Sequence, residues 1–343
     1  MSKEIRLLVV GGAGEMGRQC IKAATERGAK VVASTGRKNQ LGEDVGLLAG
    51  LPDALGITLE PSDRLEALIK ETRPDVAIMC SLDFRGQADD MRQLLKNNVN
   101  VLTLAEEAYY PKIDDQALYE ELDLLAKEHS VTLVGNGMQD VNCSNIAVVM
   151  SGNCRKLTEI YGENCCILDH CGPQEFEGLG IGCTDADDFA SYHADHPSPR
   201  NPYTYALYEI AEELGLTVID ELNENVEPIL AKEEYMGLGE RYLKDMVVGS
   251  ILYTTLKTKE GIDLVAKFIY AFEEQGYDGR NIWRFSGDPS FEVVTDDPRP
   301  DISTTAGAVN RIPDVINARP GFLLVKDLTK PFFKVHSLPE YVE

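Results

Sequence analysis

The stretch IRLLVVGGAGEMG, residues 5–17, decides the fold of the first half of the chain. It begins with a short apolar run, Ile5–Val10, typical of a buried β-strand, and an apolar helical pattern follows over Met16–Arg27. Between the two lie three glycines in the spacing GxGxxG: Gly12, Gly14 and Gly17. The first permits a tight turn, the second lets the backbone approach a pyrophosphate, and the third allows the helix to pack closely on the strand. The pattern predicts a dinucleotide-binding βαβ unit, with a bare strand-to-helix turn as the alternative.

The end of the second expected strand, Lys30–Ser34, bears on which dinucleotide would bind. An NAD site usually has Asp or Glu there, because the carboxylate accepts a hydrogen bond from the ribose 2′-OH. This chain instead has hydroxyls and cations, which suit a 2′-phosphate, so we expect NADP(H), with NAD possible. Two solvated loop cations are the alternative interpretation. The expected cofactor contacts up to this point are Gly12, Gly14, Glu15, Met16, Gly17, Ser34, Thr35 and Arg37, with Lys38 beside them.

The first 135 residues alternate between short β-rich apolar runs and longer helical patterns. This alternation predicts an α/β fold with a doubly wound parallel sheet, the Rossmann arrangement. Further strands are expected at Val76–Cys80, Val99–Thr103 and Val131–Val134, and helices over 63–71, 86–97 and 114–129.

After Gly137 the sequence becomes more polar and richer in cysteine, which indicates a second, smaller α+β domain. We expect a dinucleotide-binding domain over 1–140, a substrate and dimerisation domain over 141–300, and a tail over 301–343 that returns to the first domain. A tail of about forty residues is too short to bury a core of its own. The expected elements after residue 150 are strands at Leu157–Tyr161, Cys165–Leu168, 247–257, 264–272 and Phe322–Val325, and helices at 204–214, 235–245 and Thr304–Ile316.

Composition excludes several classes of partner. The 343 residues carry 33 Lys and Arg against 57 Asp and Glu, a net charge of −24, which repels nucleic-acid phosphates and anionic lipids. The eight cysteines have no zinc-site spacing and are expected to be reduced thiols. The sequence has neither a signal-peptide pattern nor the roughly 18 consecutive apolar residues of a membrane span. We therefore expect a cytoplasmic protein with no nucleic-acid or membrane partner.

Two segments that follow expected strands contain candidate site residues. The segment TLAEEAYYP, residues 103–111, places Glu106 and Glu107 where ligands bind in open α/β sheets, and a carboxylate there could hold an ammonium group or transfer a proton. Solvated surface acids are the alternative. The segment GNGMQD, residues 135–140, is interpreted as a hinge and cleft wall, or as a simple interdomain turn.

Histidine and cysteine also gather at residues 169–171 and 193–196, in the pattern DHC and HADH. These side chains are common metal ligands, but no recognised zinc spacing is completed, so no metal is expected. A substrate-pocket role for His170 is more economical, with His193 and His196 as surface residues.

Three separated segments resemble the native amine dehydrogenases and their relative 2,4-diaminopentanoate dehydrogenase, which are similar to the dihydrodipicolinate reductases. They are the glycine loop, the segment LAEEAYYP at 104–111, and VNRIPDVINARPG at 309–321. The resemblance implies a Rossmann domain, an open-sheet substrate domain that supports a homodimer, and hydride transfer between NAD(P)H and a carbonyl carbon with ammonia as the nitrogen donor.

The resemblance also implies roles for particular residues. The active-site glutamate of the family corresponds to Glu106, which would manage protons and charge at the iminium group. The pocket wall corresponds to Met138, Gln139, Asp140 and Cys143. On the cofactor side we expect Ser81, Thr304, Thr305 and Asn310.

The sequence leaves other functions open. NAD-using relatives carry an acid at the position of Thr35, so the cofactor preference departs from their pattern. A 2,4-diaminopentanoate dehydrogenase or a dihydrodipicolinate reductase-like enzyme is the nearest alternative to an amine dehydrogenase that uses small ketones or aldehydes. A non-catalytic NADPH sensor is an alternative of a different class.

Overall fold

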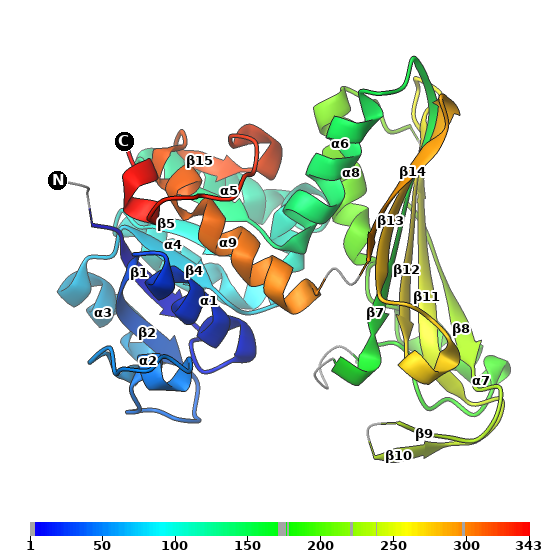
Figure 1. The fold of residues 1–343 in the computed structure, drawn as a ribbon, viewed down its shortest axis with the longest axis horizontal. Helices are drawn as coiled ribbons and strands as arrows, with labels where there is room; N and C mark the ends of the chain where they lie inside the picture. Colours follow the sequence, from blue (N-terminus) through cyan, green and yellow to red (C-terminus); the bar gives the residue numbers. More distant parts are fainter. Residues whose placement is uncertain (1–3, 171–175, 177, 220–221, 238, 297–298) are drawn as a thin grey trace. The chain divides into compact units, whose positions relative to one another are not determined.

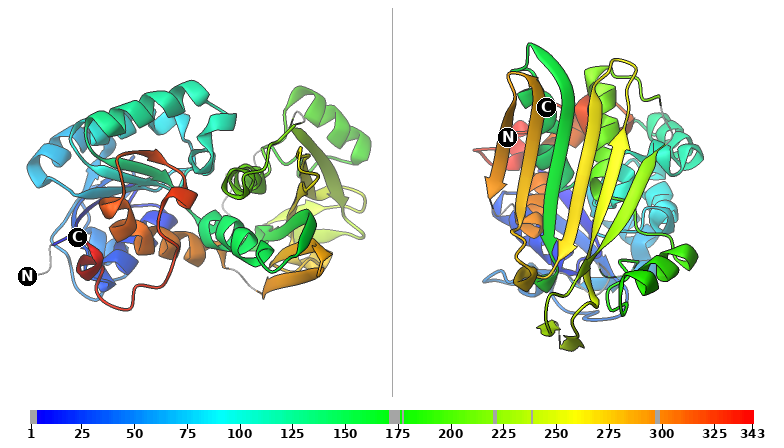
Figure 2. Two further views of the ribbon diagram at one scale, coloured as in Figure 1. Left: turned by 90° about the horizontal axis from the view of Figure 1, so that it is seen from above. Right: turned by 90° about the vertical axis from the view of Figure 1, so that its right-hand side faces the viewer.

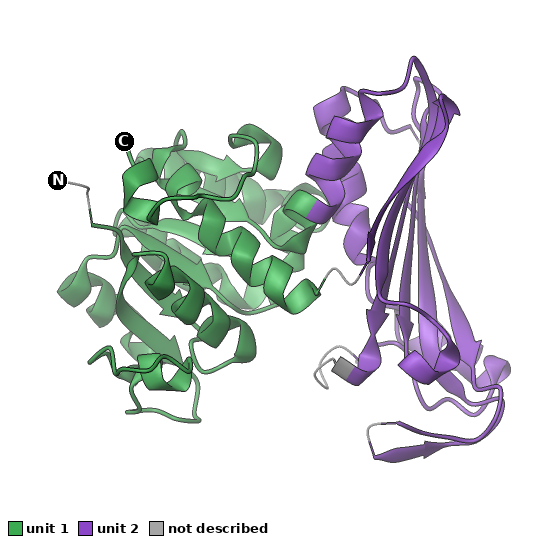
Figure 3. Cartoon of the chain, viewed as in Figure 1, with its two compact units in different colours: residues 1–141, 299–343 green, residues 142–298 purple. Residues whose placement is uncertain are grey.

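In a computed structural model, the chain folds into two compact units, shown in Figure 3. Unit 1 comprises residues 1–141 and 299–343, and unit 2 comprises residues 142–298. The structure describes residues 4–170, 176, 178–219, 222–237, 239–296 and 299–343.

Unit 1 is built on a seven-stranded sheet. Its strands are β1 (Arg6–Val10), β2 (Lys30–Gly36), β3 (Leu59–Pro61), β4 (Val76–Met79), β5 (Asn100–Thr103), β6 (Thr132–Gly135) and β15 (Gly321–Leu323). Their order is β15-β6-β5-β4-β1-β2-β3, and every neighbouring pair is parallel. The chain order reverses on the two sides of β1, so the crevice that binds ligands in such sheets lies at the carboxyl ends of β1 and β4.

Helices cover both faces of this sheet. They are α1 (Glu15–Glu26), α2 (Val45–Leu48), α3 (Leu65–Thr72), α4 (Ala88–Lys96), α5 (Gln116–Glu128) and α9 (Pro300–Asn317). Figures 1 and 2 show α1 and α9 on one face and α3, α4 and α5 on the other. Because both faces are covered, β1 and β4 consist almost entirely of buried apolar residues, and the core under α4 includes Met79, Met91 and Leu94.

The C-terminal tail completes unit 1. Strand β15 adds to the sheet beside β6, with Gly321 opposite Thr132, and α9 packs along α1. Helix α9 begins four residues before the predicted start because Pro300 occupies its first turn, where a missing N–H costs no hydrogen bond.

Unit 2 is a six-stranded mixed sheet with helices on one face. Its strands are β7 (Lys156–Ile167), β8 (Asn223–Leu230), β11 (Val247–Leu256), β12 (Asp263–Ala271), β13 (Arg280–Asp288) and β14 (Phe291–Asp296), in the order β14-β13-β7-β12-β11-β8. Among the described strands of this sheet, β7 and β12 pair in parallel and the other four neighbouring pairs are antiparallel. Helices α6 (Ile146–Ser151) and α8 (Pro202–Leu214) pack on one face, and α7 (Ala186–Asp195) contacts β8. Among the described residues, no helix of unit 2 covers the central strands on the other face (Figure 2).

The core of unit 2 is centred on the single tryptophan. Gly162 makes room for it, since a Cβ there would lie 2.7 Å from the Trp283 ring. Trp283 stacks on Tyr203 of α8, with ring centroids 5.7 Å apart, and its indole N–H donates to the carbonyl of Asn142. The predicted fold class, a doubly wound parallel sheet with a second α+β unit, is confirmed.

Two element predictions in unit 2 were wrong. The helix expected over 235–245 is a hairpin of β9 (Tyr235–Gly237) and β10 (Glu240–Tyr242), because Gly239 adopts a positive φ of +86° and ends any helix. The strands expected at 157–161 and 165–168 are one continuous strand, β7. The sequence analysis also missed α2, β3, α6, α7, β8, β13 and β14.

Candidate functional site

The glycine loop is fastened to the second strand by its backbone. The N–H groups of Gly11 and Gly12 both donate to the Thr35 carbonyl at 2.9 Å. A Cβ on Gly17 would lie 2.3 Å from the Gly11 carbonyl oxygen, so this glycine is required for the close approach of helix and loop. A Cβ on Gly14 would meet only that oxygen, at 3.5 Å. The loop is therefore tight on the protein side and open at Gly14, which fits a cradle for a pyrophosphate.

The first turn of α1 supplies backbone donors at this cradle. Gly14 is the N-cap residue and contributes no side chain, so no side-chain cap occupies the first N–H groups of the helix. Glu15 is exposed and its carboxylate accepts from Gln19 at 2.9 Å. The predicted contacts at Glu15 and Met16 would thus come from the backbone, which is where the helix dipole favours an anion.

The residues at the end of β2 differ in what they can contact. The Ser34 hydroxyl is fully buried and donates to the Val9 carbonyl at 2.9 Å, which leaves it little role in cofactor binding. Thr35 is also fully buried, but its hydroxyl has no hydrogen-bond partner among the described residues. Arg37 and Lys38 are exposed. An orphaned hydroxyl beside two cations fits the ribose end of a phosphorylated dinucleotide.

The ends of β4 and β5 complete the carboxyl edge of the sheet. Ser81 follows β4 and its hydroxyl accepts from the Asp83 N–H at 3.4 Å. The neighbouring Cys80 contacts the Cys20 thiol, and this contact together with burial raises the pKa of Cys80 well above its usual value. Cys80 is therefore a poor nucleophile. The topology brings Gly14, Thr35, Ser81 and Glu106 to one edge of the sheet.

Glu106 and Glu107 begin a 3-10 helix, Glu106–Tyr109, that directly follows β5. Gly135 at the end of β6 lets this turn pack closely, since a Cβ there would lie 2.1 Å from the Ala108 carbonyl oxygen. The side chains of both acids are half-buried. Burial raises the pKa of Glu107, and the charges of Asp114 and Asp83 act in the same direction.

The segment after β6 is held from α9. Met138 donates its N–H to the Thr304 hydroxyl at 3.3 Å, and Gln139 is buried. Asp140 is fully buried and its two carboxylate oxygens accept from Arg311 at 2.7 and 3.0 Å. The structure therefore places Asp140, a predicted substrate-binding residue, in an ion pair within unit 1.

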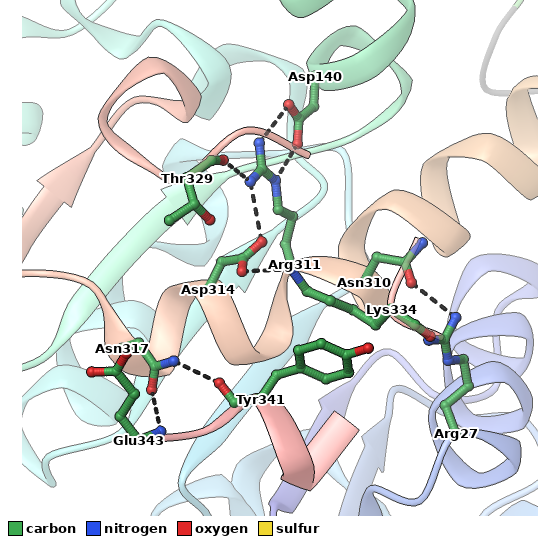
Figure 4. A network of polar contacts seen from close by, with 10 residues as sticks. All are labelled: Arg27, Asp140, Asn310, Arg311, Asp314, Asn317, Thr329, Lys334, Tyr341 and Glu343. Atoms are coloured by element: carbon green, nitrogen blue, oxygen red, sulfur yellow. Dashed lines mark hydrogen bonds and ion pairs between the residues drawn. The ribbon is translucent and has the colours of Figure 1, made fainter. Parts of the chain in front are cut away.

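The C-terminal motif NRIPDVIN, residues 310–317, holds the tail in place through hydrogen bonds and ion pairs (Figure 4). Asp314 bridges Arg311 and Lys334, and the Asn317 amide donates to the Tyr341 carbonyl. Asn310 accepts from Arg27 at 2.9 Å, just beyond the carboxyl end of α1. The twelve residues of α1 separate this contact from the glycine loop by about 18 Å.

Helix α9 approaches the cofactor cradle at its other end. Thr305 donates to the Gln19 side chain in the first half of α1, so Thr304 and Thr305 lie toward the glycine loop. The structure therefore favours these two threonines over Asn310 as cofactor neighbours. A cavity of about 230 Å³ beside Asn310 and Arg311 is smaller than ordinary ligand pockets.

Unit 2 contains a buried polar cluster around Cys143. This residue lies next to the Tyr203 hydroxyl, which donates to Asn281. Asn164 is fully buried in the same cluster and lies beside the Tyr203 hydroxyl.

The histidines do not form a metal site in the described part of the chain. No group of three or more metal-ligating side chains occurs there. His196 stacks on Tyr192 and lines a cavity of about 510 Å³ in unit 2, and the buried Nε2 of His193 has no hydrogen-bond partner among the residues that the structure describes. His170 ends a 3-10 helix, but its side chain and Cys171 lie outside the described residues. Among the described helices, none is long and apolar enough to cross a bilayer.

Comparison with known proteins covers both units. A family model for the 2,4-diaminopentanoate dehydrogenase C-terminal domain matches residues 143–342, and one for the dihydrodipicolinate reductase N-terminus matches residues 5–100. The 2,4-diaminopentanoate dehydrogenase of Acetoanaerobium sticklandii is 24% identical over 338 residues, which cover 96% of this chain and 94% of that protein. The 4-hydroxy-tetrahydrodipicolinate reductase of Methanococcus aeolicus is 37% identical over 105 residues, 29% of this chain and 37% of that protein.

Solved structures are also similar to this chain. The amine dehydrogenase of Mycobacterium smegmatis superposes with a TM-score of 0.87 and 26% identity over 97% of this chain and 98% of that one. Biliverdin reductase from Synechocystis has a TM-score of 0.53 and 13% identity over 85% of this chain and 79% of that one, a likeness of fold alone.

Proposed function

Because this chain belongs to the 2,4-diaminopentanoate dehydrogenase family, we propose that it is an NADPH-preferring amine dehydrogenase that aminates small ketones or aldehydes. The family expected from the sequence motifs is confirmed. The chain is an oxidoreductase that acts on CH–NH2 donors and binds a nicotinamide cofactor through its Rossmann unit. The finer steps, ammonia as the nitrogen donor and Glu106 as the residue that transfers the proton and stabilises the charge, are the proposal.

The placement of Glu106 carries this proposal. It stands on the first turn after β5, at the sheet edge that also holds the glycine cradle. In the proposed reaction, ammonia and the carbonyl lose water to form an imine, the protonated iminium carbon accepts a hydride, and the product is a primary amine. The nicotinamide supplies that hydride when it is bound. Glu106 accepts a proton from ammonium before attack and returns it when the carbinolamine loses water, and the carboxylate that is regenerated stabilises the iminium cation.

The test measures loss of NADPH absorbance with a panel of small ketones and aldehydes, with and without ammonium. The wild-type protein is expected to consume NADPH only when a carbonyl compound and ammonium are both present. In Glu106→Gln this rate is expected to be lower by about a hundredfold or more, while the variant still binds NADPH. Glu107→Gln is the matched control, since it removes the adjacent carboxyl group. Normal turnover by Glu106→Gln would contradict the assigned role, and turnover without ammonium would indicate an alcohol-forming reductase.

A second candidate is oxidation of 2,4-diaminopentanoate, which the name of the Acetoanaerobium relative favours. The same panel should therefore include this diamine with NADP+ and NAD+. The match to dihydrodipicolinate reductases spans only residues 5–100 and so bears on the cofactor unit rather than on the substrate. If the protein binds NADPH but turns over no compound of the panel, the result would instead support the alternative of a non-catalytic NADPH sensor.

The proposed preference for NADPH rests on the end of β2. Positions 34–42 contain no acid, and Thr35, Arg37 and Lys38 offer a hydroxyl and two cations for a 2′-phosphate. We also propose a cytoplasmic location, since none of the seven described cysteines forms a disulfide.

We propose that two copies associate through the bare face of the unit 2 sheet. Alternate residues of β12 are buried under the helices, whereas Val265 and Lys267 face the other side and are half-buried. Tyr161 and Tyr253 lie beside them in the register. Sedimentation velocity should show a dimer that Val265→Glu converts to a monomer, and a monomeric wild-type protein would contradict this proposal.

A further inference from the structure

Arg18 connects the two loops that flank the adenosine side of the cofactor cradle. It lies on α1, directly after the last glycine of the motif. Its Nε donates to the Ala13 carbonyl in the glycine loop at 2.9 Å, and its Nη2 donates to Oε1 of Gln40, beyond the end of β2, at 2.8 Å. The guanidinium group is thus half-buried between the segment that would hold the pyrophosphate and the segment that would hold the adenosine ribose.

The polar and charged groups around Arg18 favour the binding of an anion. Its two acceptors are neutral, so no carboxylate among the described residues balances its charge. Arg37 and Lys38 add two exposed cations on the loop between β2 and Gln40. The Thr35 hydroxyl, at the end of β2, is buried and without a partner among the described residues.

Two acids on neighbouring elements already have hydrogen-bond partners. Glu60 of β3 lies opposite Thr35 in the sheet register, but its carboxylate accepts from Arg64 at 3.3 Å and from Thr58 at 2.9 Å. Glu15 on α1 accepts from Gln19.

We propose that Arg18 is a specificity-determining residue that binds the 2′-phosphate of NADP(H) from the helix side, opposite Arg37 on the loop. This inference rests on the proposed preference for NADPH. The contact with Ala13 orients the guanidinium before the ligand arrives, which reduces the side-chain entropy lost on binding. Gln40 holds the terminal nitrogen until a phosphate oxygen, a stronger charged acceptor, replaces it.

The test uses the adenosine half of the cofactor, so it depends on neither catalysis nor the nicotinamide. Isothermal titration calorimetry compares 2′,5′-ADP with 5′-AMP on the full-length wild-type protein and on Arg18→Met. The wild type is expected to prefer 2′,5′-ADP, and Arg18→Met is expected to weaken 2′,5′-ADP about ten- to a hundredfold with little change for 5′-AMP. Lys22→Met, on an exposed position of the same helix, is the matched control for a lost positive charge.

A second variant keeps the arginine and changes its partner. Gln40→Glu gives Arg18 a carboxylate that competes with the phosphate, so it should also weaken 2′,5′-ADP selectively, and Arg18→Lys should restore part of the preference. Equal binding of the two ligands by the wild type would contradict the NADPH preference itself. A wild-type preference that survives in Arg18→Met would overturn the role of Arg18 alone. Equal losses for both ligands would show that Arg18 only supports the loop.

Discussion

Arg311 and Asp140 form a bidentate ion pair at 2.7 and 3.0 Å, with both side chains almost completely buried in unit 1. The pair joins α9 to the segment that follows β6. Asn136 donates to the same carboxylate at 2.8 Å, so Asp140 is held from two elements. Such a pair is strongly destabilising to break, because a lone charge stays behind in a dry environment.

We predict that Asp140→Asn destabilises the protein by about 3 kcal/mol, since Asp314 still partly balances Arg311. Urea unfolding followed by circular dichroism measures this loss. Glu66→Gln is the matched control, because it breaks an exposed pair with Lys70 and should leave the unfolding midpoint almost unchanged. Unchanged unfolding together with a raised KM for the amine would instead support the substrate role predicted from the sequence.

The glycine loop allows a second prediction that separates folding from binding. Gly14→Ala meets no clash and should cost about 1 kcal/mol of stability, but it should weaken NADPH binding because the pyrophosphate approaches at this point. Gly17→Ala places a Cβ 2.3 Å from the Gly11 carbonyl oxygen and should lower both stability, by about 1–3 kcal/mol, and binding. Thermal unfolding and NADPH titration distinguish the two variants. Wild-type affinity in Gly14→Ala would rule out this position of the pyrophosphate.

A third prediction concerns the support of Glu106. A side chain at Gly135 would press on the Ala108 carbonyl, so Gly135→Ala should move the 3-10 helix that begins at Glu106. We expect amination to fall by about tenfold or more with NADPH affinity almost unchanged, because a small misplacement of a catalytic group is costly. Steady-state rates and cofactor titration on the same samples check this. A parallel loss of NADPH binding would show that the damage is not confined to Glu106.

The first unit was predictable because its constraints are local. Glycine spacing, a buried strand and a helix within about 30 residues allow one arrangement, and β1, α1 and β2 follow it. The hairpin of β9 and β10 was not predictable in this way. Tyr235 and Tyr242 are seven residues apart, which suits one face of a helix, yet the hairpin places them directly opposite each other.

The position of Glu106 in the fold was predictable because it follows a strand, and its role stays a prediction. The candidate site was not predictable where it depends on pairing between distant segments. Asp140 and Arg311 are 171 positions apart, and Asn310 accepts a hydrogen bond from Arg27, so their polar groups make contacts between distant segments of the chain. A single sequence does not indicate such pairings.

Glu107 allows a prediction about pH. Burial raises the pKa of this carboxyl group in the folded protein, so the folded state holds the proton more tightly than the unfolded chain does. Stability therefore falls as the pH rises from the unfolded pKa through the folded pKa. Glu107→Gln removes this effect, so its melting temperature relative to the wild type should rise between about pH 4 and about pH 7. Differential scanning calorimetry at both pH values tests the sign. A constant difference would mean that the fold leaves the pKa of Glu107 unshifted, and a difference that falls with pH would mean that its carboxylate is stabilised in the fold, which would make it a rival to Glu106 as the charged carboxylate of the site.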